Sequence, residues 1–148
     1  MVSEQDQQRI LKSLSESTAA GRELRAQAMT LLDGLPDYNW SGIYRLEGDE
    51  LVLDEFVGEP TDHTRIPIGR GVCGTAVSEN ANQIVSDVRS LDNYLACSVK
   101  TRSEIVVLIK SEGQIIGQVD IDGHTVGAFD RSDEALLEKM AVILAERW

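Results

Sequence analysis

Glu104–Asp122, with the sequence EIVVLIKSEGQIIGQVDID, decides the fold of this chain because it carries the strongest strand pattern. Two runs rich in isoleucine and valine flank Ser111-Glu112-Gly113, and this arrangement predicts an antiparallel β-hairpin. Side chains of a strand alternate between its two faces. We therefore expect one face to carry Ile115, Gly117, Val119 and Ile121, and the other to carry Ile116, Gln118, Asp120 and Asp122.

The segments on either side of this hairpin predict a sheet flanked by helices. A second hairpin is expected over residues 40–46 and 51–57, short strands over 65–68 and 83–88, and a short helix over 72–79. Residues 3–33 should be helical with a break near Gly21, and a last helix should begin after Asp130. The expected fold is α+β: an antiparallel sheet with N- and C-terminal helices packed on one face. Residues 1–148 would form a single domain.

The composition is that of a globular protein with a strongly acidic surface. The chain has 148 residues, with 25 acidic and 14 basic side chains and a formal net charge of −11. Such a surface repels phosphate backbones and anionic membranes, so we expect no nucleic acid and no membrane partner. No apolar run approaches the ~20 residues of a membrane span, and the N-terminus lacks a signal-peptide pattern. A cytoplasmic protein with reduced thiols is expected.

Two cysteines lie in segments that predict loops or a helix start rather than strand centres. Cys73 follows Gly69-Arg70-Gly71-Val72, and a helix N-terminus favours a thiolate. Cys97 is followed closely by Lys100 and Arg102, which would have the same effect. Each cysteine taken alone is equally consistent with a small buried hydrophobe.

Three carboxylates should converge at one end of the hairpin. Asp120 and Asp122 lie on the same strand face about 7 Å apart, and a turn centred on residues 112–113 pairs Glu104 with a residue near 121. Acids this close cannot all ionise freely, so they suit a bound ammonium group or a proton transfer. The alternative is a solvated strand end.

Metal and cofactor motifs are absent from the sequence. His63, Cys73, Cys97 and His124 are possible ligand types, but no CxxC or HxxxH spacing supports a zinc site. No phosphate-binding loop or dinucleotide fingerprint is present either. We expect neither a metal nor a cofactor.

Several blocks of sequence resemble the free methionine-(R)-sulfoxide reductases, which are single-domain GAF enzymes. The blocks are Gly69–Ala76 (GRGVCGTA), Ala96-Cys97, Ser103–Val107 (SEIVV), Ile116-Gly117 and Asp120–Asp122 (DID). The resemblance implies that Cys97 is the catalytic thiolate, which attacks the sulfoxide and becomes a sulfenic acid, and that Cys73 can form a disulfide during recycling. It further implies that Glu104, Asp120 and Asp122 hold the substrate ammonium group and protonate the sulfoxide oxygen. Trp40 and Tyr44 would line the pocket, and thioredoxin would be the reductant.

The chain departs from the family pattern at four positions. His63 stands where the family usually has a further, resolving cysteine, and Ser98 replaces an aspartate that commonly follows the catalytic cysteine. Leu108 and Gly123 stand where proline and serine are frequent. The departure at His63 keeps an alternative open, a non-catalytic GAF module that binds a small molecule. GAF domains also often pair through their terminal helices, so the resemblance allows a homodimer.

Overall fold

A computed structural model describes residues 1–95 and 98–148 of the chain. The helices are α1 (Glu4–Glu16), α2 (Gly21–Leu32), α3 (Gly71–Glu79) and α4 (Arg131–Glu146), with a short 3-10 turn over Val88–Ser90. The strands are β1 (Trp40–Glu47), β2 (Glu50–Val57), β3 (Arg65–Pro67), β4 (Gln83–Val85), β5 (Ser103–Ser111) and β6 (Gln114–Gly123). The predicted elements are present, although the strand expected over 83–88 ends at Val85.

Side-chain caps explain where two of the helices begin. The Ser3 hydroxyl accepts a hydrogen bond from the Asp6 backbone N–H at the start of α1. At α4, Asp130 and Asp133 form a capping box. The Asp130 side chain accepts a hydrogen bond from the Asp133 backbone N–H, and the Asp133 side chain accepts one from the Asp130 backbone N–H. Capping residues satisfy backbone N–H groups that the first helical turn leaves without a partner.

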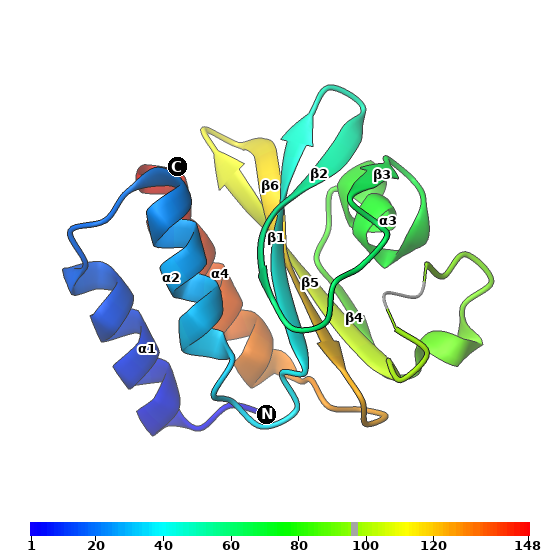
Figure 1. Cartoon of the computed structure of the whole chain (residues 1–148), viewed down its shortest axis with the longest axis horizontal. Coiled ribbons are helices and arrows are strands. Elements are labelled where there is room, and N and C mark those ends of the chain that lie inside the picture. The colour runs from blue at the N-terminus through cyan, green and yellow to red at the C-terminus, as the bar shows by residue number, and fades with distance from the viewer. Residues whose placement is uncertain (96–97) are drawn as a thin grey trace.

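The six strands form one antiparallel sheet in the order β3-β2-β1-β6-β5-β4 (Figure 1). Each of the two predicted hairpins is present, and the pairing of β1 with β6 joins them in the middle of the sheet. Helices α1, α2 and α4 cover one face, and α3 lies on the opposite side of the sheet (Figure 1). The expected α+β architecture, with terminal helices on one face, is confirmed.

A β-bulge interrupts the β5–β6 hairpin and corrects the predicted alternation. Ile109 pairs with Gly117, whereas Lys110 pairs with Ile115, so Ile116 is an extra residue in β6. Ile116 therefore packs on the helix side and Ile115 on the other side, the reverse of the expected faces. Beyond the bulge, Val119 and Ile121 face the helices as expected.

The larger apolar core lies between the sheet and helices α1, α2 and α4. It includes Ile10, Leu24, Ile105, Ile121 and Leu137, all fully buried. Each such side chain contributes about 1.5–3 kcal/mol when removed from water. A smaller cluster on the α3 side contains Trp40, Tyr44, Cys73 and Val106. Among the described residues, no helix is both long and apolar enough to cross a membrane.

Candidate active site

The strand register brings the three predicted acids together on the α3 side of the sheet. Glu104 of β5 lies directly opposite Asp122 of β6, and Asp120 follows two residues away on the same face. The bulge at Ile116 is responsible, because an unbroken ladder from the turn would pair Glu104 with Ile121, which faces the helices. A shift of one residue moves a side chain to the other face of the sheet. The predicted convergence is present, with the partner of Glu104 at position 122 rather than 121.

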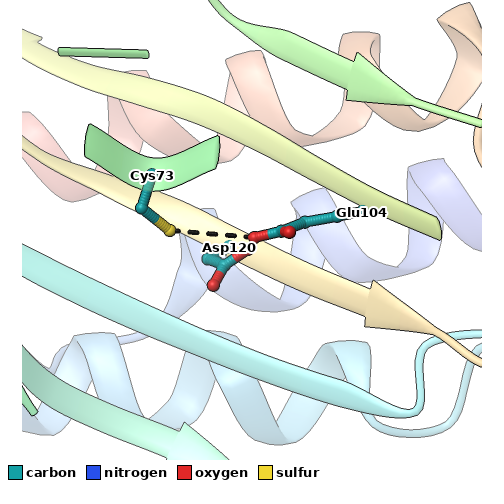
Figure 2. Close-up of side chains that lie close together, drawn as sticks. All are labelled: Cys73, Glu104 and Asp120. Atoms are coloured by element: carbon teal, nitrogen blue, oxygen red, sulfur yellow. Dashed lines mark hydrogen bonds between the residues drawn. The ribbon is translucent and has the colours of Figure 1, made fainter. Parts of the chain in front are cut away.

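Helix α3 carries Cys73 onto this acidic face. The Cys73 thiol donates a hydrogen bond to Glu104 Oε1 over 3.8 Å, as Figure 2 shows. One possible ligand atom from each of Cys73, Glu104 and Asp120 lies within 4.8 Å of the other two. Gln118 Nε2 donates to the Cys73 carbonyl oxygen over 3.1 Å, which ties the first turn of α3 to β6. The side chain of Cys73 thus meets two carboxylates in the protein interior.

Burial and mutual repulsion govern the protonation of the acids. Burial raises the pKa of Glu104 well above its usual value, and the neighbouring Asp120 and Asp122 raise it further. Burial also raises the pKa of Asp120, while hydrogen bonding with Glu104 and Cys73 opposes the shift. Beyond Glu104 and Cys73, no side chain in the described part of the protein donates to either Asp120 oxygen. Among the described residues Asp120 therefore has no cationic partner, and its carboxyl group suits a cation or a proton from a ligand.

A cavity of about 340 Å³ opens beside Asp122. Its lining combines an aromatic ring, carboxylates, hydroxyls and an imidazole, contributed by Asn39, Trp40, Gly58, Glu59, Ser98, Thr101, Asp122 and His124. This volume lies within the usual range for small-molecule sites. Another hollow of about 260 Å³, between α3 and β4, contains none of the predicted site residues. The cavity beside Asp122 is therefore the candidate substrate pocket.

Trp40 forms one wall of the candidate pocket. It lies opposite Asp122 across the β1–β6 pairing, so the indole and the carboxylate share a face. The ring stacks on Phe56 with centroids 5.8 Å apart and an interplanar angle of 18°. Its Nε1–H donates to the Glu59 carbonyl oxygen over 3.0 Å. These two contacts fix an apolar surface next to the acids.

Tyr44, the second predicted aromatic, lies deeper in the same face. It is fully buried opposite Gln118, and its hydroxyl donates to the His63 carbonyl oxygen over 2.9 Å. It is not among the residues that line the cavity beside Asp122. Its hydrogen bond instead holds the loop that carries His63 against the sheet.

A narrow hollow of about 10 Å³ lies beside Cys73 and Glu104. Cys73, Glu104, His63 and Leu95 are among its lining residues. The imidazole at the family's extra cysteine position thus lines the same space as Cys73.

The predicted catalytic Cys97 lies outside the described residues, as does Ala96. The described neighbours on either side, Leu95 and Ser98, line the narrow hollow and the larger cavity respectively.

Two residues that position the site were not singled out from the sequence. Gln118 was expected on the acidic face, and only the structure shows that it anchors Cys73. Gly42 lies opposite Asp120, and a Cβ atom there would be 2.3 Å from Trp40 Cη2. The period of two in β6 could have indicated Gln118, whereas nothing in the sequence marks Gly42 as the residue beneath an indole.

Comparisons with known proteins agree on one type of domain. A family model described as a GAF domain matches residues 15–146. The chain is 45% identical over 114 residues to the free methionine-R-sulfoxide reductase of Escherichia coli (strain K12), covering 77% of this chain and 68% of that protein. It also resembles the structure of a free methionine-R-sulfoxide reductase from Neisseria meningitidis in complex with its substrate, with 34% identity, a TM-score of 0.87, and coverage of 99% of this chain and 92% of that one. The reduced form of the corresponding Staphylococcus aureus protein gives 37% identity, a TM-score of 0.86, and coverage of 97% and 92%.

Proposed function

Because the chain belongs to the GAF domain family and, within it, to the free methionine-R-sulfoxide reductases, we propose that it reduces free methionine (R)-sulfoxide to methionine. The observation that carries this proposal is the buried cluster of Glu104, Asp120 and Asp122 beside a cavity of about 340 Å³. A free amino acid would bring an ammonium group to these acids, of which Asp120 has no cationic partner among the described residues. A peptide-bound methionine would bring a neutral amide, which cannot neutralise them. The site therefore favours the free amino acid over a protein substrate.

The wall beside the acids suits the other end of the substrate. The Trp40 indole offers an apolar surface for the methyl-sulfur group, while Glu104, Asp120 and Asp122 hold the ammonium group. Binding at both ends fixes the sulfoxide between them, and such positioning lowers the entropic part of the barrier. Tyr44 lies deeper on the same face, where its hydroxyl group holds the loop that carries His63.

The chemistry assigned to Cys97 is nucleophilic attack on the sulfoxide sulfur. The thiolate bonds to that sulfur while an acid of the cluster protonates the sulfoxide oxygen. The oxygen is then transferred to the cysteine, so methionine leaves and Cys97 becomes a sulfenic acid. Methionine sulfoxide is reduced by two electrons and the thiol is oxidised by two. No metal or cofactor is needed for this step.

Recycling is assigned to Cys73. Its thiol attacks the sulfenic sulfur of Cys97, water leaves, and a disulfide forms between the two cysteines. A dithiol reductant of the thioredoxin class then restores both thiols in a reducing cytoplasm. His63 cannot take the role that a cysteine has at this position in relatives, so Cys73 must resolve the intermediate or an external thiol must do so. Pairing of two chains through their terminal helices is compatible with this scheme.

The test is the consumption of each epimer of free methionine sulfoxide with dithiothreitol as reductant. We expect the R epimer to be consumed and the S epimer to remain. Cys97→Ser should abolish turnover because the nucleophile is lost, whereas His63→Ala should have little effect. Turnover retained in the Cys97→Ser chain would rule out the mechanism.

The second candidate function is a GAF module that binds the amino acid without reducing it. The replacement of the family's extra cysteine by His63 favours it, since recycling then has one thiol fewer. Isothermal titration with methionine sulfoxide separates the two. Binding of the ligand with no consumption of either epimer would support the binding module.

A further inference from the structure

Three side chains from three different elements form a compact set of metal-ligand types. Cys73 comes from α3, Glu104 from β5 and Asp120 from β6, and all three are buried. Figure 2 shows that the thiol and both carboxylates point toward one another. One ligand atom of each lies within 4.8 Å of the other two.

The separations suit a small thiophilic cation. Bond lengths of about 2.3 Å to sulfur and 2.0–2.2 Å to oxygen in a tetrahedral zinc site place the two ligand atoms roughly 3.6 Å apart. Cys73 Sγ and Glu104 Oε1 are 3.8 Å apart. The ligand atoms are therefore near their coordinating positions, and small rotations of the Glu104 and Asp120 carboxyl groups would complete the set.

Two independent features point to an ion at this place. Asp120 is fully buried, and only Glu104 and Cys73 are polar partners of its oxygens in the described part of the chain. The narrow hollow beside Cys73 and Glu104, of about 10 Å³, has about the volume needed for one water molecule. It is too small for an organic ligand, but it can hold the water that would complete the coordination of an ion.

We propose that Cys73, Glu104 and Asp120 form a site for one divalent cation of the Zn²⁺ type, with a water molecule in the fourth position. A thiolate ligand selects Zn²⁺ over Mg²⁺ and Ca²⁺, which prefer oxygen ligands alone. A bound ion occupies the thiol assigned to recycling and two of the acids assigned to substrate binding. Zinc would therefore inhibit the reductase reversibly; this consequence, unlike binding itself, rests on the proposed function.

The test of binding uses Co²⁺ as an optical probe in a Cys97→Ser chain, so that Cys73 is the only thiol. We expect one Co²⁺ per chain and a thiolate-to-cobalt charge-transfer band, which an equivalent of Zn²⁺ removes. Cys73→Ser in the same background should remove the band. Glu104→Gln and Asp120→Asn should each weaken binding at least about 10-fold. The matched control is Glu112→Gln, an exposed acid on the hairpin turn, which should leave binding unchanged.

Three results would overturn the metal site, provided that thermal unfolding shows each variant to be folded. They are a missing band, a band that persists in the Cys73→Ser chain, and equal affinity in the Glu104→Gln, Asp120→Asn and Glu112→Gln chains. Turnover of the R epimer by the unsubstituted chain, measured with Zn²⁺ and again after a chelator, tests inhibition separately. A clear band without any turnover would support the metal site and contradict the proposed function. Turnover insensitive to Zn²⁺, with no band, would contradict the metal site alone.

Discussion

Gly42→Ala should disturb the wall of the candidate pocket because Gly42 lies directly beneath the Trp40 indole. A Cβ atom at this position would be 2.3 Å from Trp40 Cη2 and 2.6 Å from Cζ3, well inside van der Waals contact. The indole cannot move freely, since it stacks on Phe56 and donates a hydrogen bond to the Glu59 carbonyl oxygen. The added methyl group must therefore displace the ring or bend β1.

The expected cost follows from overpacking. Extra methyl groups in a well-packed interior cost about 1–3 kcal/mol. For a chain of this size, each kcal/mol lowers the melting temperature by about 2–4 °C, so Gly42→Ala should lower it by about 2–12 °C. A displaced indole also removes the apolar wall, so KM for free methionine (R)-sulfoxide should rise.

Gly34→Ala is the matched control for this experiment. Nothing lies within 4 Å of a Cβ atom at Gly34, so the same change should leave stability unchanged or raise it slightly. Differential scanning calorimetry and steady-state kinetics on both variants measure the two effects. If the Gly42 and Gly34 variants have the same melting temperature and the same KM, the close approach to Trp40 does not constrain the site.

Two further predictions concern the helix side of the molecule. Tyr38 donates to Asp133 over 2.7 Å, and burial followed by the Asp133 charge raises the pKa of this phenol above its ordinary value of 10.0. The neutral phenol therefore stabilises the fold below about pH 10, and this stability is lost as the pH rises further. Tyr38→Phe should flatten the fall in unfolding free energy above about pH 10, measured in urea between about pH 10 and 12, and an equally steep fall would contradict this assignment. Arg25 and Arg45 both contact Asp54, at 2.6 and 3.2 Å, but only Arg25 is buried. Arg45 still contacts Asp54 in the Arg25→Ala chain, so this change should cost about 1–3 kcal/mol, against about 0–1 kcal/mol for Arg45→Ala. Equal losses in urea unfolding would show that the burial of Arg25 is irrelevant.

The hairpin over residues 104–122 shows how far the sequence determines the fold. Apolar patterning predicts both strands and the turn, because burial of one strand face requires a period of two. The bulge at Ile116 was not predictable, since either neighbouring isoleucine can face the core. Counting from the turn consequently predicted a partner of Glu104 near residue 121, whereas the partner is Asp122. The three acids still lie close together.

The candidate site was predictable only where its residues lie on strands. Glu104, Asp120 and Asp122 could be grouped from strand geometry, and they do converge. The residues that line the cavity from loops, such as Asn39, Glu59 and Thr101, could not, because loop positions depend on tertiary contacts rather than on local pattern. For the same reason, the spacing of ligand types along the chain gave no sign of the set formed by Cys73, Glu104 and Asp120.

One face of the sheet carries the large apolar core and the other face carries the acids. This arrangement explains how the buried acids are tolerated. Placing carboxyl groups of raised pKa in the interior costs free energy, and the α3 side has only a small apolar cluster to offset it. The opposite face of the same strands packs Ile105, Val119 and Ile121 into the large apolar core beneath the helices. Since successive side chains of a strand point to opposite faces, the strands that carry the acids are also held by the large core on their other face. A truncation such as Ile121→Ala should therefore act mainly on unfolding free energy, whereas Glu104→Gln should act on ligand binding without a comparable loss of stability.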